Sequence, residues 1–368
     1  MRAAVISFTA RGKELNRQIV EILRGTGWDC RGWVQERFFR EGDGFQVLSG
    51  SLTDWTGKRF QDQDALIFVG ACGIAVRASA PWVKDKFQDP AVLAADEKGT
   101  FVIPLLSGHA GGANRLAREL AAGLGAVPVI TTATDVNGRF AVDVFAAENG
   151  CALSSRVLAK KLSADILAGK SAALSSDFPV DGLFPPEVWF PEGEMSEMRF
   201  PEDNPPEPFS PVSLRITWSD QERKEELRLI PRAVVLGMGC RRGICAERLR
   251  REAERTLQEA GVDRRAVRAI ASADLKRAEE GLIRLAEEWG IPFLTFSAEE
   301  MEKIPGQFSA SEFVKKTAGV DCVCERAAMA AVLERGGRGY LLAGKRKGDQ
   351  VTSALAAEKI VIHTGEQK

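Results

Sequence analysis

The chain has 368 residues, which is more than one hydrophobic core usually organises, so we expect about two or three domains. Its 50 lysines and arginines are balanced by 51 aspartates and glutamates, which leaves no overall charge to attract nucleic acid or an anionic membrane. No stretch approaches the roughly 20 apolar residues of a membrane span, and the first apolar run is too short for a signal peptide. An odd number of cysteines, 7, does not suggest a secreted disulfide framework, so we expect a cytoplasmic protein.

Predicted strands and helices alternate through the first third of the chain. Apolar runs predict strands at residues 3–8, 65–69, 101–106 and 127–131. Apolar residues at helical spacing predict a helix after the first run and another after the third: Leu15, Ile19, Ile22 and Leu23, then Leu116, Leu120 and Leu124. This alternation predicts an α/β domain over residues 1–145 with a mostly parallel sheet, whose ligands bind beyond the carboxyl ends of the strands.

Residues 146–231 show a different pattern. Val157, Leu162, Ile166 and Leu167 predict one helix. The following residues 179–211 are rich in proline and acidic residues, which disfavours a long helix and compact packing. We therefore expect an irregular, Pro-rich middle region that ends with short strands at residues 214–218 and 226–230.

A second alternating pattern fills residues 232–368 and predicts another α/β domain. The expected fold class is thus α/β, with two α/β domains of mostly parallel sheets joined by the irregular middle region. Strands are predicted at residues 233–236, 267–271, 293–296, 319–323 and 339–343, and helices at residues 247–260, 276–288 and 325–333.

The segment from Ser107 to Asn114 reads SGHAGGAN and lies between a predicted strand and a predicted helix. Its glycines allow a sharp turn and a close approach to a ligand, and the amides at a helix start favour an anion. His109 has an ordinary pKa near neutrality, so it could exchange a proton there. The alternative is that His109 only braces the turn through a backbone hydrogen bond.

A second glycine-rich segment, GMGCRRG at residues 237–243, also follows a predicted strand and precedes a helix. Its third glycine comes one residue late for G-x-G-x-x-G, and no acidic residue ends the next strand, so nicotinamide binding is not favoured. We expect an anion-binding loop that uses Arg241 and Arg242. A plain turn with solvated arginines and a nucleotide-binding regulatory loop are the alternatives.

Several of these segments resemble the cobalt-precorrin-5A hydrolase family of cobalamin biosynthesis. The N-terminal domain of that family is similar to FVGACGIAVR at residues 68–77, DPAV at residues 89–92, SGHAGGAN, and TTATD at residues 131–135. Its C-terminal domain is similar to LGMGCRRG at residues 236–243, ASADLK at residues 271–276 and GVDCVCE at residues 319–325. The resemblance covers about residues 1–145 and 232–368, and the middle region corresponds to the family's variable part.

The resemblance implies that the lactone of cobalt-precorrin-5A is hydrolysed to give cobalt-precorrin-5B and acetaldehyde. His109 is then expected to be the general base, with oxyanion support from amides near Gly111 and Gly112. Asp135 would orient His109 or protonate the leaving carbon, unless it only caps a turn. We expect no cofactor and no protein-held metal, because the cobalt arrives inside the substrate and the Cys322–Cys324 pair lacks a second pair of ligands.

Precorrins carry acetate and propionate groups, which arginine and lysine side chains bind well. Basic residues near predicted strand ends include Lys84, Lys86 and Lys345. Glu325 either caps its helix or contacts the substrate. We expect both α/β domains to contribute to the substrate-binding set: Arg77, Gly108, Gly111, Gly112, Asn114, Thr132, Thr134, Gly237, Gly239, Cys240, Arg241, Arg242, Ser272, Lys276 and Glu325.

The expected partner is the cobalt-bound precorrin, together with transient contacts to other enzymes of the pathway, and neither nucleic acid nor a membrane. A non-catalytic tetrapyrrole carrier is the alternative function, because it would explain the basic loops without any chemistry at His109. Release of acetaldehyde discriminates between the hydrolase and the carrier.

Overall fold

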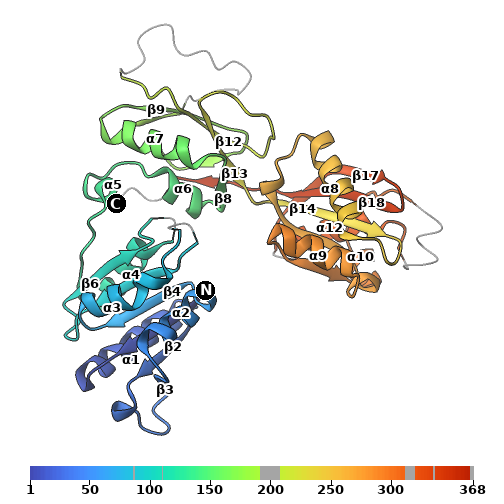
Figure 1. The fold of residues 1–368 in the computed structure, drawn as a ribbon. Helices are drawn as coiled ribbons and strands as arrows, with labels where there is room; N and C mark the ends of the chain where they lie inside the picture. Colours follow the sequence, from blue (N-terminus) through green and yellow to red (C-terminus); the bar gives the residue numbers. More distant parts are fainter. Residues whose placement is uncertain (86–87, 110, 191–207, 311–319, 335, 365–368) are drawn as a thin grey trace. The chain divides into compact units, whose positions relative to one another are not determined.

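The computed structural model describes residues 1–85, 88–109, 111–190, 208–310, 320–334 and 336–364 (Figure 1). The chain divides into two compact units, Met1–Val144 and Phe145–Lys368, which are described separately. No helix in the described ranges is long and apolar enough to cross a membrane.

The first unit is built on a seven-stranded sheet with the order β3-β2-β1-β4-β5-β6-β7. All neighbouring strands are parallel except β5 and β6. The predicted strands at residues 3–8, 65–69 and 101–106 are confirmed. The bounds are β1 Arg2–Ser7, β2 Asp29–Val34, β3 Phe45–Val47, β4 Ala65–Val69, β5 Ala91–Ala95, β6 Phe101–Leu106 and β7 Val127–Pro128.

Helices cover both faces of this sheet (Figure 1). Successive residues of a strand point to opposite faces, so Ile67 packs in the cluster with α1 and α4, whereas Phe68 packs beside Trp55 of α2. Both predicted helices, α1 and α4, are confirmed. The helices of the unit are α1 Ala10–Gly25, α2 Leu52–Asp62, α3 Cys72–Ser79, α4 Ala113–Leu124 and α5 Ala133–Val136, with the short η1 Glu36–Phe38 and η2 Ala80–Trp82, and α6 Val142–Glu148 at the boundary.

The antiparallel pairing of β5 and β6 determines where the SGHAGGAN segment lies. Leu106, the last residue of β6, pairs with Val92 near the start of β5. The segment therefore follows the carboxyl end of β6 but lies at the edge where β4 and β5 begin. Gly70 to Gly73, which follow β4, lie at the opposite edge. The FVGACGIAVR and SGHAGGAN segments thus lie at opposite ends of the strands of this sheet.

The predicted strand at residues 127–131 is too long. Only Val127 and Pro128 pair as β7, and the chain then leaves the sheet because Thr132 is the N-cap of α5. This early departure brings the residues of α5 next to the loop that follows β6.

The described part of residues 146–231 is more regular than the irregular region expected from the sequence. It forms a five-stranded sheet with the order β11-β9-β12-β13-β8. The strands predicted at residues 214–218 and 226–230 are confirmed as β12 and β13, and the predicted helix is α7. Most of the proline-rich segment, residues 191–207, lies outside the described residues. The bounds are β8 Cys151–Leu153, α7 Arg156–Leu167, β9 Ala172–Ser176, β11 Val188–Trp189, β12 Ser213–Ile216 and β13 Glu226–Pro231, while β10 Val180–Asp181 pairs with β19 Ile362–His363.

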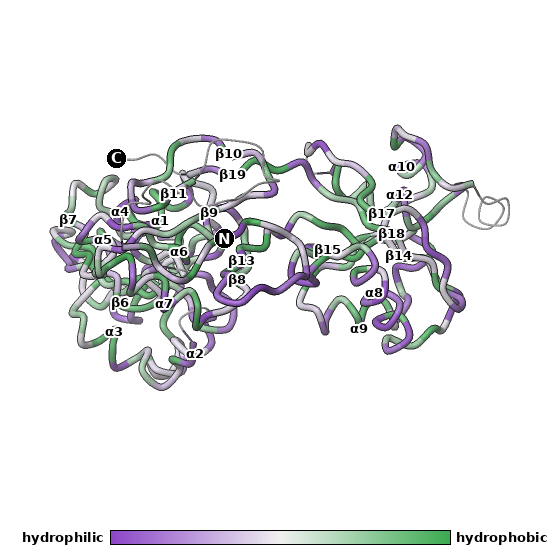
Figure 2. Tube along the Cα trace, turned by 90° about the horizontal axis from the view of Figure 1, so that it is seen from above, coloured by the Kyte–Doolittle hydropathy of each residue, from purple (hydrophilic) through white to green (hydrophobic). Residues whose placement is uncertain are grey.

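The C-terminal sheet has the order β16-β15-β14-β18-β17, with β14, β15 and β16 parallel and β18 antiparallel to both of its neighbours. The strand β18 was not predicted. Figure 2 shows the strongly hydrophilic α8, which buries Leu249, Ala253 and Leu257. The bounds are β14 Val234–Cys240, α8 Ala246–Ala260, η3 Arg264–Ala266, β15 Val267–Ala273, η4 Asp274–Lys276, α9 Glu280–Trp289, β16 Phe293–Phe296, α10 Ala298–Glu302, α12 Val323–Leu333, β17 Gly339–Lys347 and β18 Val351–Glu358.

One prediction in this domain is wrong, and one predicted helix is confirmed with a later start. Within residues 319–323, the described residues 320–323 form no strand, because Cys322 is the N-cap of α12 and Val323 begins the helix. The helix predicted at residues 276–288 begins later, at Glu280, after the short η4. In both places the residue at which the helix begins could not be read from the apolar pattern.

Gly237 and Gly239 lie inside β14 and not in a loop, which corrects the expected GMGCRRG turn. A Cβ atom on Gly237 would lie 1.8 Å from the carbonyl oxygen of Cys324 in α12. Such a contact is far inside van der Waals range, so a residue without a side chain is needed where α12 crosses the strand. Gly237 therefore serves the packing of α12.

We expect Gly237→Ala to lower the stability of the C-terminal domain by at least about 1–3 kcal/mol, because the methyl group can fit only if α12 moves. Thermal unfolding of the whole chain would measure this effect. Gly25→Ala at the end of α1 is the control, since a Cβ there meets nothing within 4 Å. Equal melting temperatures for the two variants would contradict the packing explanation.

Candidate active site

His109 lies between two carboxylates in the first unit. Its Nε2 is 2.9 Å from Oδ2 of Asp135, and its Nδ1 is 3.3 Å from Oδ1 of Asp143. The hydroxyl oxygen of Thr134 is also 3.0 Å from Nε2. The side chains of His109, Asp135 and Asp143 are 17%, 15% and 12% exposed, so the cluster is largely shielded but still reached by solvent.

Two side chains of α4 hold Asp135 in place. Asn114 donates from Nδ2 to Oδ2 of Asp135 and to the hydroxyl oxygen of Thr132, both at 2.9 Å. Arg118, one turn further along the helix, donates to Oδ1 of Asp135 at 2.5 Å. Asp135 is therefore bonded by His109, Asn114 and Arg118, and its orientation is fixed by three separate groups.

The glycine-rich loop that carries His109 is tightly closed. Ser107 has a φ of 57°, a left-handed conformation that is uncommon for a residue with a side chain. A Cβ on Gly111 would lie 2.3 Å from Cβ of Ser107, and a Cβ on Gly108 would lie 2.8 Å from Oδ1 of Asn114. These glycines are needed because the loop folds back on its own side chains.

The expected oxyanion site needs one correction. The amide of Gly112 donates to the carbonyl of His109 at 2.8 Å, and the amide of Asn114 donates to Gly108 at 2.9 Å. Both donors are used to close the loop, so the Gly112 amide does not point at a substrate. The oxyanion expectation is therefore wrong for Gly112.

The two carboxylates favour the charged form of His109. The hydrogen bond to Asp143 raises the pKa of His109 above its ordinary value, with a further contribution from Asp135, although burial opposes this. Burial also acts against ionisation of Asp135, but hydrogen bonds from Arg118 and His109 hold the pKa of Asp135 below its usual range. An imidazolium has two donors and no lone pair, so in this state His109 can donate a proton but cannot accept one.

Five residues of the predicted set meet in this cluster: His109, Asn114, Thr132, Thr134 and Asp135. Arg77 is exposed on α3, and the structure gives no contact between it and this cluster. Lys86 lies outside the described residues.

Sequence reasoning missed Asp143 and Arg118. Arg118 could have been found, because it is four residues after Asn114 and so lies on the same face of α4. Asp143 carried only a weak signal, an acidic residue in the first turn of a helix between two valines. Its position opposite His109 is set by tertiary structure.

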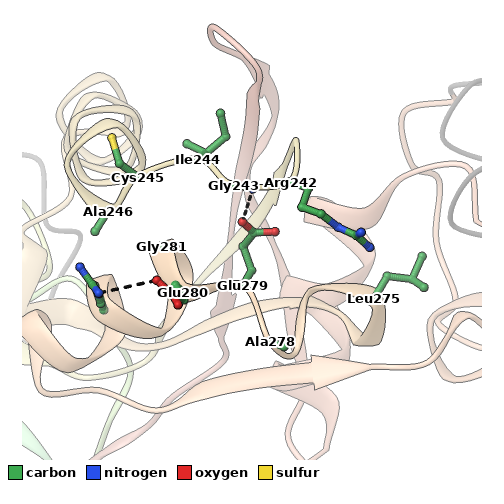
Figure 3. A pocket seen from close by; sticks show the side chains of 11 residues that line it. Arg242, Gly243, Ile244, Cys245, Ala246, Leu275, Ala278, Glu279, Glu280 and Gly281 are labelled. Carbon is green, nitrogen blue, oxygen red and sulfur yellow. Dashed lines mark hydrogen bonds and ion pairs between the residues drawn. The ribbon is translucent and has the colours of Figure 1, made fainter.

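In the C-terminal domain, four predicted residues line one pocket of about 350 Å³: Gly239, Cys240, Arg241 and Lys276. Arg242 lines a second pocket of about 500 Å³. Figure 3 shows Glu279 in this second pocket turned toward the backbone of Gly243, with Arg242 and Leu275 beside it. Glu279 accepts a 2.6 Å hydrogen bond from the Gly243 amide and pairs with Lys276 at 2.9 Å, so a carboxylate already occupies the amide at the last residue of the GMGCRRG segment.

Two other predicted substrate contacts prove to be structural. Ser272 is 0% exposed and donates to the carbonyl of Met238 at 2.6 Å. Glu325 is 2% exposed and accepts hydrogen bonds from both the amide and hydroxyl of Ser309 and from the amide of Lys345. Buried groups whose hydrogen bonds are satisfied internally do not meet a ligand, so both residues are removed from the substrate-binding set.

Cys322 and Cys324 lie side by side, with their sulfur atoms 3.7 Å apart. Among the described residues, no group of three or more histidine, cysteine or acidic side chains is arranged to hold a metal ion. Both cysteines are free and buried, Cys322 as the N-cap of α12 and Cys324 within its first turn.

The doubly wound first unit and its histidine–carboxylate cluster define an α/β protein with a candidate acid–base site. Residues 54–135 match the family described as "Cobalamin synthesis G N-terminal", and residues 234–356 match "Cobalamin synthesis G C-terminus". The chain belongs to this cobalamin synthesis G family, which confirms the resemblance found in the sequence and gives the chain a role in cobalamin biosynthesis.

Curated relatives match over most of their length. The chain is 40% identical over 334 residues to the cobalt-precorrin-5A hydrolase of Salmonella typhimurium, covering 88% of this chain and 90% of that protein. It is 32% identical over 359 residues to the cobalt-precorrin-5A hydrolase of Priestia megaterium, covering 96% and 94%. Protein CobE of a Sinorhizobium species is 32% identical over 124 residues, which are 33% of this chain and 79% of that protein.

Replacing Asp143 by asparagine should lower the pKa of His109, because it removes the charge that most favours the imidazolium. NMR titration of the imidazole signals would measure this directly, since the chain has only 2 histidines. Asp181→Asn, which changes the carboxylate 3.4 Å from His363, is the control and should leave His109 unchanged. An unaltered titration of His109 in Asp143→Asn would rule out the bridging arrangement.

Proposed function

We propose that this chain hydrolyses cobalt-precorrin-5A to cobalt-precorrin-5B, opening the lactone and releasing acetaldehyde. The two full-length relatives, both named cobalt-precorrin-5A hydrolase, support this reaction. The observation that carries it is the position of His109 between Asp135 and Asp143, which suits repeated proton transfer. No observation favours the non-catalytic carrier.

In the first step, water adds to the lactone carbonyl carbon and the bond from that carbon to the ring oxygen breaks. His109, as an imidazolium, gives its proton to the departing oxygen, while the protons of the water pass to solvent. The products are a carboxylate and an alcohol, and His109 is left neutral. Asp135 is held ionised by Arg118, so we assign it the role of orienting His109 and not that of a proton donor.

In the second step, neutral His109 acts as the base expected from the sequence. It removes the proton of the new alcohol, whose oxygen then forms the carbonyl of acetaldehyde as the carbon–carbon bond to the macrocycle breaks. The electron pair of that bond enters the macrocycle, which takes a proton from solvent. His109 returns to its charged form between the two aspartates, so one residue serves as acid and then as base.

Cobalt enters this scheme only as part of the substrate, and the proton transfers use the chain's own side chains. We place the reaction in the cytoplasm, where thiols stay reduced, which is consistent with 7 free cysteines. Transient contacts with other pathway enzymes would limit exposure of the substrate to solvent.

His109→Gln should lower acetaldehyde release by roughly 10²- to 10⁴-fold, the usual contribution of a general acid–base group. Glutamine keeps a hydrogen-bonding side chain but cannot shuttle a proton. Anaerobic incubation with cobalt-precorrin-5A, with acetaldehyde measured, tests this expectation. His363→Gln is the matched control, since it alters the other, exposed histidine and should retain full activity.

The results separate three possibilities. Near-wild-type release by His109→Gln would eliminate the proton-transfer role and leave His109 as a brace of its loop. No release by the wild-type chain, despite tight substrate binding, would favour the carrier. Loss of activity in His109→Gln with unchanged substrate binding supports the hydrolase.

The first step needs the protonated imidazole, so activity should fall as pH rises through the pKa of His109, which lies above its ordinary value. Asp143→Asn lowers that pKa and should move this fall to lower pH. A pH profile of acetaldehyde release for both proteins would detect the shift. An identical alkaline limb in the two proteins would mean that another group controls the step.

A further inference from the structure

The pocket of about 350 Å³ in the C-terminal domain lies where β14 and β15 end, beside the first residue of α12 and the turn between β17 and β18. These are the carboxyl ends of two parallel strands, the usual position of a ligand site in an α/β sheet. Ala273, Val323 and Val351 supply apolar side chains to its wall, and Leu275, which is 68% exposed, lies at its margin. The lining is mostly apolar.

Four cationic residues line the same pocket: Arg241, Lys276, Lys345 and Lys347. We call this site the basic pocket. Lys276 is paired with Glu279. Among the described residues, no carboxylate forms an ion pair with Arg241, Lys345 or Lys347, so the positive charge around the basic pocket is largely uncompensated.

The alternation of β17 explains this arrangement. Arg346, between the two lysines, forms an ion pair with Glu259 of α8. Neighbouring residues of a strand point to opposite faces, which fits the position of Lys345 and Lys347 in the lining of the basic pocket. Arg346 thus attaches α8 to the sheet, whereas Lys345 and Lys347 remain available for a ligand.

The backbone around the basic pocket does not suit a phosphate. Gly237 and Gly239 are strand residues, the amide of Arg241 donates to the carbonyl of Gln350 at 3.0 Å, and the amide of Gly243 donates to Glu279. A phosphate-binding loop presents a cluster of unused amides. Here the positive charge is carried by separate side chains, which suits several carboxylates spread along an apolar body.

We propose that the basic pocket binds a carboxylate-bearing edge of the tetrapyrrole, with its apolar wall against the ring and Arg241, Lys345 and Lys347 paired with acetate or propionate groups. This inference rests on the proposed function for its choice of ligand. The volume is near the lower end of the range for small-molecule pockets, so it holds one edge of the macrocycle and not the whole ring.

The test uses the full chain and the double variant Lys345→Gln/Lys347→Gln, which removes charge but leaves the main-chain bond from Lys345 to Glu325. The probes are dicyanocobyrinic acid, a corrin whose ring side chains are carboxylates, and dicyanocobinamide, in which they are amides. Binding is followed by calorimetry. The matched control is Lys224→Gln/Lys359→Gln, which changes net charge equally at two exposed positions outside the basic pocket.

We expect the wild-type chain to bind the carboxylate corrin more tightly than the amide corrin, and increasingly so at low salt. The pocket variant should lose about 10- to 100-fold in affinity for the carboxylate corrin, as expected for the loss of charge-assisted contacts. Its affinity for the amide corrin should be unchanged, and the control variant should match the wild type for both probes.

Equal affinity of the wild type for the two corrins would overturn the proposal. So would an equal loss in the control variant, because the effect would then come from net charge. Displacement of the carboxylate corrin by millimolar inorganic phosphate would show a general anion site instead. A pocket-dependent preference for the carboxylate corrin in a chain that releases no acetaldehyde would uphold this inference and refute the proposed reaction, so the two can fail separately.

Discussion

A histidine bonded on both sides to carboxylates organises one edge of the first unit. His109 comes from the loop after β6, Asp135 from α5 and Asp143 from the start of α6, so three segments depend on one imidazole. The charge that Asp135 and Asp143 carry is offset by His109 itself and by Arg118. The two carboxylates favour the protonated imidazole and raise the pKa of His109, which suits a group that gives up a proton and later regains it.

A different constraint shapes the C-terminal domain, where β14 and α12 come closer than side chains allow. The absence of a Cβ at Gly237 lets the carbonyl of Cys324 lie against the strand. The close packing buries α12 on nearly all sides and places its first residue, Val323, in the wall of the basic pocket. Gly237 thus permits the close packing of α12, whose first residue contributes to the pocket wall.

The two candidate sites differ in how their charge is balanced. In the histidine cluster each ionised group has an oppositely charged partner. These partners raise the pKa of His109 and lower that of Asp135, and little net charge remains to attract a ligand. In the basic pocket, no carboxylate of the described residues forms an ion pair with the side chains of Arg241, Lys345 or Lys347. Balanced charge suits proton transfer, whereas unbalanced charge suits attraction of an anionic substrate.

Much of the fold could be predicted because buried strands and amphipathic helices leave a direct pattern. The runs at residues 65–69, 101–106 and 293–296 coincide with β4, β6 and β16, since each is a short, mostly apolar run bounded by polar residues, glycine or proline. The strands β9 and β18 were missed because their small residues, such as those of AALSS in β9, give little hydrophobic contrast. The strand β18 pairs with β17 directly before it and with β14 far away in the sequence, and β9 pairs with β11 and β12.

The sequence by itself determined the family, the α/β class and the importance of the loop around His109, because short motifs and hydrophobic periodicity are local properties. Only the tertiary structure decided what surrounds each motif. In that structure Asp143 lies against His109. Ser272 and Glu325 are buried and make internal hydrogen bonds, whereas Lys345 and Lys347 line a pocket. The reason is that the ionisation and accessibility of a side chain depend on groups brought close by strand order and helix packing, and sequence spacing does not record those distances.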